Sequence, residues 1–86
     1  MNPNPSLSEI EAALIKEAAS LLPDAPSQIT RDTPLHDLGL DSLRLFELFV
    51  FIEKEFALSL LDAPVTRANL ESIGALARHI SNRLHA

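Results

Sequence analysis

The stretch Leu38-Gly39-Leu40-Asp41-Ser42-Leu43 places a serine hydroxyl directly after a turn and at the start of a long apolar segment. Gly39 can adopt the left-handed backbone conformation that a tight turn requires. The apolar residues after Ser42 recur with helical spacing, and a helix that starts here leaves its first N–H groups unpaired beside a partial positive charge. We therefore expect Ser42 to lie in a field that favours an attached anionic group by roughly 0.3–1 kcal/mol.

The helix expected from about Ser42 to Phe56 has two apolar faces instead of one. At 100° per residue, one arc about 100° wide is suited to a core, and it holds Leu45, Leu48, Phe49, Ile52 and Phe56. A second arc, interleaved with Glu47, Glu53 and Lys54, holds Leu43, Phe46 and Val50. Phe51 lies apart from both. The second arc is either covered by a long loop or exposed as a surface for a partner.

Capping signals mark the other helices. Ser6 and Ser8 each stand three residues before a glutamate, which predicts a capping box at the start of the first helix, and Pro23 and Pro26 end it. Residues 22–41 then form a long connection with one helical turn, for which Thr33 and Pro34 are the expected N-cap and first residue.

The C-terminal part predicts a short third helix over residues 66–70 and a last helix capped by Ser72. The apolar residues of that last helix are Ile73, Leu76, Ile80 and Leu84. Gly74 weakens it, so we expect a close packing contact there. The chain is predicted to be all-α: a small antiparallel four-helix bundle with a flexible N-terminus at residues 1–6 and a single domain over residues 7–86.

Composition excludes several classes of function. The 86 residues have 47% hydrophobic content, no cysteine and a net charge of −5, so disulfides and Cys-ligated zinc are absent. Residues 32–62 hold seven acids against two bases, which would repel nucleic acids and attract basic partners. The N-terminus has no signal-peptide pattern and no segment approaches the length of a membrane span. We expect a monomeric cytoplasmic protein.

Ser42 does not have the surroundings of a catalytic nucleophile. A hydrolase elbow reads G-x-S-x-G between a strand and a helix, whereas this serine lies between Asp41 and Leu43 in a helical chain. A small bundle also offers little concavity for an oxyanion hole. The three histidines are scattered, so no metal site is predicted. We expect no catalytic residues and no enzyme activity.

The segment from Leu38 to Leu43, with Leu35-His36-Asp37 before it and an apolar helix after it, closely resembles the phosphopantetheine attachment site of acyl and peptidyl carrier proteins. The resemblance covers roughly residues 7–84. It implies that Ser42 bears a covalent 4′-phosphopantetheine arm from coenzyme A, after the turn at Gly39, and that Asp41 helps to organise the magnesium-dependent transfer. The plainer alternatives are that Ser42 is an ordinary N-cap and that Asp41 only caps the helix.

The resemblance further implies a carrier that docks through the helix after Ser42. Its expected partners are a phosphopantetheinyl transferase and acyl-activating, synthase or acyltransferase enzymes. The predicted docking residues are Leu43, Arg44, Phe46, Glu47, Val50 and Glu53.

Two features of that helix depart from bacterial fatty-acid carriers. Arg44 stands where those carriers usually have an acid, and Glu53-Lys54 stands where they often have two glutamates. These departures favour a specialised fatty-acyl or polyketide pathway. An aminoacyl or peptidyl carrier, or a carrier-like fold used only as an interaction module, stays as the alternative.

Overall fold

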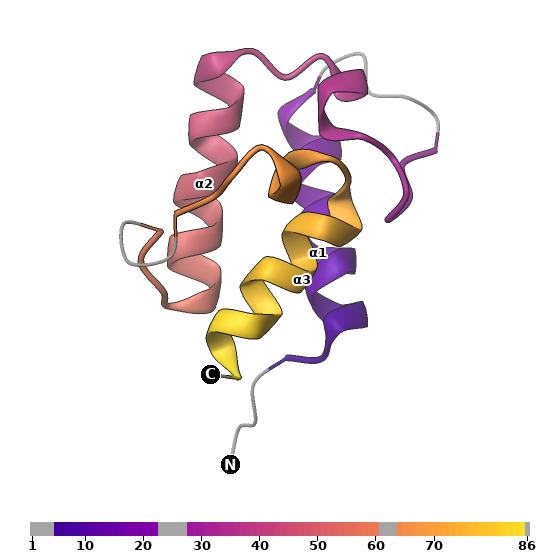
Figure 1. The fold of residues 1–86 in the computed structure, drawn as a ribbon. Helices are drawn as coiled ribbons and strands as arrows, with labels where there is room; N and C mark the ends of the chain where they lie inside the picture. The colour runs from indigo at the N-terminus through magenta and orange to yellow at the C-terminus, as the bar shows by residue number, and fades with distance from the viewer. Residues whose placement is uncertain (1–4, 23–27, 61–63, 86) are drawn as a thin grey trace.

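The computed structural model describes residues 5–22, 28–60 and 64–85, and all regular structure in these ranges is helical. The α-helices are α1 (Leu7–Leu21), α2 (Ser42–Phe56) and α3 (Ile73–Leu84), with 3-10 turns η1 (Leu35–Leu38) and η2 (Ala68–Leu70). Helix α1 runs opposite to α2 and α3, as Figure 1 shows. The all-α class is confirmed. The short third helix predicted at residues 66–70 is present as the three-residue 3-10 helix η2, so the described part of the chain has three α-helices instead of four.

Side-chain caps fix where α1 and α3 begin. The hydroxyl of Ser6 accepts from the Glu9 N–H at 3.1 Å, and the Glu9 carboxylate accepts from the Ser6 N–H at 2.8 Å. This is the reciprocal capping box that the sequence predicts. The Ser72 hydroxyl accepts from the Ala75 N–H at 3.0 Å, which confirms the predicted cap of α3.

The core lies between the three helices and extends under η1. Its buried apolar residues are Ile10, Leu14, Ala18, Leu35, Leu38, Leu48, Ile52, Phe56, Ile73, Leu76, Ala77 and Ile80. Leu45 and Phe49, predicted for the inner arc of α2, are half-buried against this cluster. The inner arc of α2 therefore faces the core as predicted.

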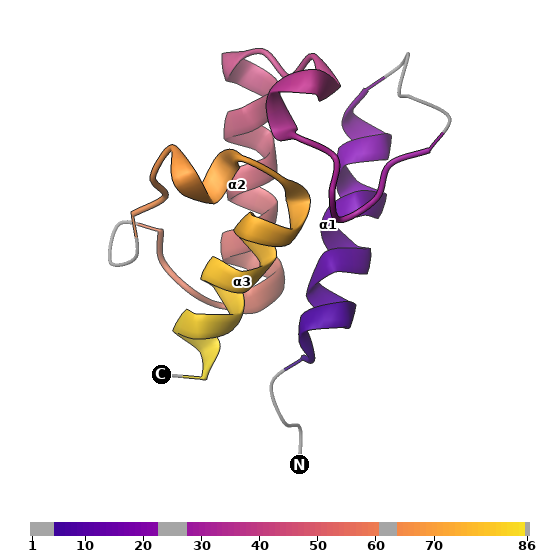
Figure 2. The ribbon, with the colours of Figure 1, turned by 45° about the vertical axis from the view of Figure 1, so that its right-hand side comes forward.

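The connection before α2 is anchored on the start of α3, beside which it lies in Figure 2. The Ile73 N–H donates to the Thr33 carbonyl at 3.1 Å, and the Gly74 N–H donates to the Arg31 carbonyl at 2.7 Å. A Cβ on residue 74 would lie 3.2 Å from that Arg31 oxygen, which supplies the close contact predicted for Gly74. These bonds satisfy N–H groups that a helix start leaves without intrahelical partners.

The start of η1 differs from the prediction. Pro34 occupies the N-cap position without a side-chain cap, and Leu35 is the first residue of the turn. The Thr33 hydroxyl instead accepts from the Thr30 N–H at 2.9 Å, inside the preceding turn. The predicted Thr33 cap is therefore wrong, because that hydroxyl is already used locally.

Two further expectations concern the ends of the chain and the membrane. Residues 1–4 of the predicted flexible N-terminus lie outside the described residues, whereas Ser6 caps α1. No helix among the described residues is long and apolar enough to cross a membrane.

Candidate functional site

The turn before α2 is held by η1 and Gly39. Leu35 and Leu38 are buried and fix η1 on the core. Gly39 then ends η1 in the left-handed conformation, with φ 76°, which a residue with a side chain adopts at a cost of about 1 kcal/mol or more. This reversal brings Leu40 and Asp41 to the start of α2.

Asp41 is the N-cap of α2. Its Oδ1 atom accepts from the Arg44 N–H at 2.8 Å, and its carbonyl accepts from the Leu45 N–H at 2.9 Å. The alternative that Ser42 is the N-cap is therefore wrong. Asp41 does cap the helix, and its part in the transfer reaction stays a prediction. Because Asp41 caps the helix, the hydroxyl of Ser42 is not needed as a cap and can carry an attached group.

Ser42 is the first residue of α2, and it is exposed. In the part of the chain that the structure describes, no hydrogen bond occupies its hydroxyl or the N–H groups of Ser42 and Leu43. An anionic group esterified to this oxygen would lie beside those donors at the positive end of the helix. The residues at the start of α2 therefore fit a covalently attached phosphodiester.

Arg44 ties the start of α2 to the end of α1. Its Nη1 atom donates to the carbonyl oxygen of Leu21, the last residue of α1. A basic side chain here satisfies one of the carbonyls that a helix end leaves open and complements the negative end of the helix dipole. Arg44 thus has a structural contact that its predicted place on the docking surface does not reveal.

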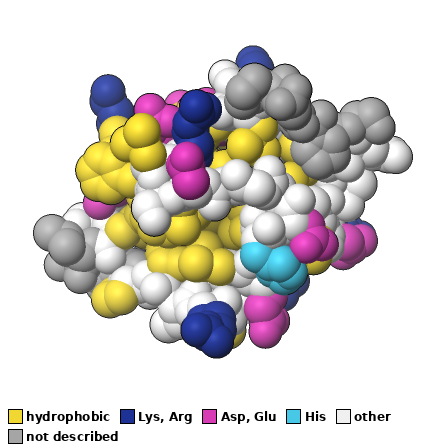
Figure 3. Space-filling model, turned by 90° about the horizontal axis from the view of Figure 1, so that it is seen from above, with side chains coloured by type: hydrophobic (Ala, Val, Ile, Leu, Met, Phe, Trp, Pro, Cys, Tyr) yellow, Lys and Arg dark blue, Asp and Glu magenta, His cyan; other side chains and the backbone are white. Residues whose placement is uncertain are grey.

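The outer face of α2, defined by Leu43, Phe46 and Val50, is uncovered. Leu43 and Phe46 each keep 63% of their surface exposed, and Val50 keeps 36%. Of the two alternatives, coverage by the long connection is therefore wrong, since these large apolar side chains remain at the surface. Figure 3 looks onto the upper end of the bundle and shows hydrophobic side chains gathered there among charged groups.

The two acidic residues predicted for docking differ in their surroundings. Glu47 is exposed beside Phe46 in the sequence. Glu53 is half-buried, and its Oε2 atom accepts from the Leu60 N–H at 2.9 Å, so it holds the chain that follows α2. Of the two, Glu47 is the carboxylate available to guide a basic partner, while a docking role for Glu53 stays a prediction.

A cavity of about 500 Å³ lies next to the start of α2. It is lined by Leu35, His36, Leu40, Leu45, Arg67, Leu70 and Glu71. Leu40 and Leu45 flank Ser42 in the chain, so the cavity borders the site. Sequence periodicity could not find it, because its walls come from η1, α2 and η2, which meet only in the folded chain.

The start of α2 presents an exposed serine that does not cap the helix. This serine lies at the positive end of the helix dipole and beside an apolar cavity. These features define a small helical domain that can carry an anionic group on its serine. A family model described as phosphopantetheine attachment site matches residues 4–80. The chain belongs to this family, whose members carry a covalently attached 4′-phosphopantetheine group. No curated protein and no solved structure matches the chain.

Proposed function

We propose that the chain is an acyl carrier protein and that Ser42 is the attachment site of its phosphopantetheine arm. The observation that carries this proposal is the exposed Ser42 hydroxyl at the start of α2. This hydroxyl does not cap the helix, because Asp41 is the N-cap. When bound, the arm supplies a terminal thiol that holds acyl groups as thioesters. The chain has no cysteine, so it contributes no thiol of its own. We expect no catalytic activity from the carrier itself.

Asp41 has two roles in this proposal. Its Oδ1 atom holds the helix start through the Arg44 N–H, while its other carboxylate oxygen can face a transferase and its magnesium ion. The first role needs an oxygen acceptor, and the second needs the negative charge. Asp41→Asn keeps an acceptor for the cap but removes the charge, so it separates the two roles.

Acyl cargo is favoured over aminoacyl cargo by the apolar lining next to Ser42. Four leucines contribute to that lining, which suits a carbon chain better than a charged ammonium group. The exposed outer face of α2 supports docking to partner enzymes, since apolar residues bordered by charge mark interaction surfaces. Arg44 and the Glu53-Lys54 pair support a specialised fatty-acyl or polyketide pathway.

The test is the mass of the intact protein after incubation with coenzyme A and a broad-specificity phosphopantetheinyl transferase. The wild-type chain should gain one arm, and Ser42→Ala should gain none while keeping its helicity. Ser8→Ala, which removes another exposed helical serine, is the matched control and should load like the wild type. A mass gain in Ser42→Ala would overturn the assignment.

The same assay examines Asp41. Asp41→Asn should slow loading by at least about tenfold, which corresponds to roughly 1.4 kcal/mol in the barrier. Its melting temperature should change little, because asparagine is also a good N-cap. An unchanged loading rate would leave Asp41 with the capping role alone.

The wild type tests the alternative function. If the wild type itself gains no mass, the chain is a carrier-like interaction module instead.

A further inference from the structure

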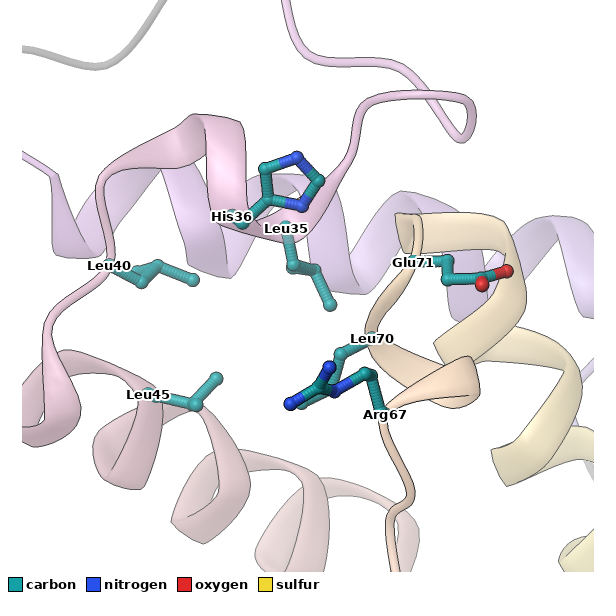
Figure 4. Close-up of a pocket in the computed structure, with 7 residues that line it drawn as sticks. All are labelled: Leu35, His36, Leu40, Leu45, Arg67, Leu70 and Glu71. Carbon is teal, nitrogen blue, oxygen red and sulfur yellow. The ribbon is translucent and has the colours of Figure 1, made fainter.

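The cavity beside Ser42 has an apolar wall and a charged edge. Leu35, Leu40, Leu45 and Leu70 converge on it from η1, the turn before α2, α2 and η2, as the close-up in Figure 4 shows. Arg67, which precedes η2, completes the side opposite η1. A site with an apolar body and a few placed polar groups is typical of one that binds a small molecule in a fixed orientation.

Arg67 is the charged group that points into this space. In Figure 4 its guanidinium lies near Leu70 and is directed towards the middle of the cavity, while the carboxylate of Glu71 is directed away. His36 lies beside another carboxylate, with Nε2 3.2 Å from Oδ1 of Asp37. Within residues 5–22, 28–60 and 64–85, no hydrogen bond or ion pair engages the Arg67 side chain. The cation is therefore not neutralised by Glu71, its neighbour on the cavity edge.

We propose that this cavity takes an acyl group that ends in a carboxylate, with Arg67 as the residue that selects it. A saturated chain lying here would cover the guanidinium without giving it a hydrogen-bond partner, which carries a desolvation cost. A carboxylate at the far end of the chain would accept two parallel hydrogen bonds from the planar guanidinium while its methylene groups contact the leucines. The inference rests on the proposed function, because the cargo reaches the cavity from the arm on Ser42.

The experiment compares two cargoes with the same number of carbon atoms. The transferase moves the whole acyl arm from hexanoyl or adipoyl coenzyme A to Ser42 of the apo forms of the wild type, Arg67→Met and Arg78→Met, with release of adenosine 3′,5′-bisphosphate. Intact mass first establishes that each protein carries one acyl arm. The rate at which hydroxylamine cleaves each thioester is then measured at pH 7, since a chain held in the cavity is protected. Methionine keeps the length of the apolar stem without the charge. Arg78 is an exposed arginine of α3 outside the cavity lining, so it is the matched control.

The expected result is a loss of adipoyl protection in Arg67→Met by roughly two- to fivefold, the range that a solvent-accessible ion pair supports. Hexanoyl protection should stay equal or rise slightly in the same variant, and Arg78→Met should match the wild type with both cargoes. Equal ratios of adipoyl to hexanoyl cleavage in the wild type and Arg67→Met would overturn the inference. Failure to load any arm would instead contradict the proposed function, so the two failures are distinguishable.

Discussion

The inner and outer faces of α2 are both apolar, yet the fold uses them differently. Leu48 and Ile52 on the inner face are completely buried between the helices, whereas Leu43 and Phe46 on the outer face keep 63% of their surface exposed. Hydrophobic burial stabilises in proportion to the area removed from water, so the inner face carries stability and the outer face contributes little to it. Apolar character alone therefore does not identify the core of this chain.

The largest effect is expected on the inner face. Ile52→Ala should lower the free energy of unfolding by about 2–5 kcal/mol, because it removes buried methyl groups and leaves a cavity. Chemical denaturation followed by circular dichroism measures this loss. A loss below about 1 kcal/mol would mean that the inner face is not the stabilising one.

The next effect concerns the anchor that holds the connection before α2. Gly74→Ala should destabilise by about 1–3 kcal/mol, because the new Cβ would lie 3.2 Å from the Arg31 carbonyl, which is backbone and cannot swing aside. In an unconstrained helix the same change would stabilise by up to about 1 kcal/mol. The sign of the shift in melting temperature therefore decides whether the contact with Arg31 governs this position. An increase in Tm would contradict the packing described here.

A smaller effect on stability is expected from Asp41, the N-cap of α2, which holds the start of the helix and so both of its apolar faces. Asp41→Ala should lower stability by about 1 kcal/mol through loss of the bond to the Arg44 N–H. Asp41→Asn is the control and should keep most of that stability. If the two variants melt alike, the cap does not contribute as the geometry indicates.

The sequence predicted much of the fold because its decisive signals are local. The Ser6 capping box, the Ser72 cap and the residue range of α2 depend on neighbours within a turn, and all three are confirmed. The helical period of 100° per residue likewise identified the inner face correctly. The position of Ser42 at the start of α2 followed from the same signals.

The burial of Phe51 and the contacts between elements distant in the sequence could not be predicted in the same way. Phe51 falls outside both arcs, yet it is half-buried, and its ring meets that of Phe56 edge-on with centroids 6.4 Å apart. It also borders a surface hollow with Ala13 of α1, a neighbour that a helical wheel does not include. The hydrogen bond from Arg44 to the Leu21 carbonyl joins residues 23 positions apart, so a pattern within one helix could not predict it either. Side chains with long reach thus acquire roles that periodicity does not encode.

The most direct test of the division between the two faces compares Phe46→Ala with Phe49→Ala in the same two assays, thermal melting and the rate of arm transfer by the transferase. Phe49 is half-buried against the core, so its loss should lower stability by about 1–3 kcal/mol, below the 3–5 kcal/mol of a fully buried phenylalanine. Phe46→Ala should cost less than about 0.5 kcal/mol, the range of an exposed substitution, while it slows transfer. Equal destabilisation by the two variants, or unchanged transfer in Phe46→Ala, would contradict the account.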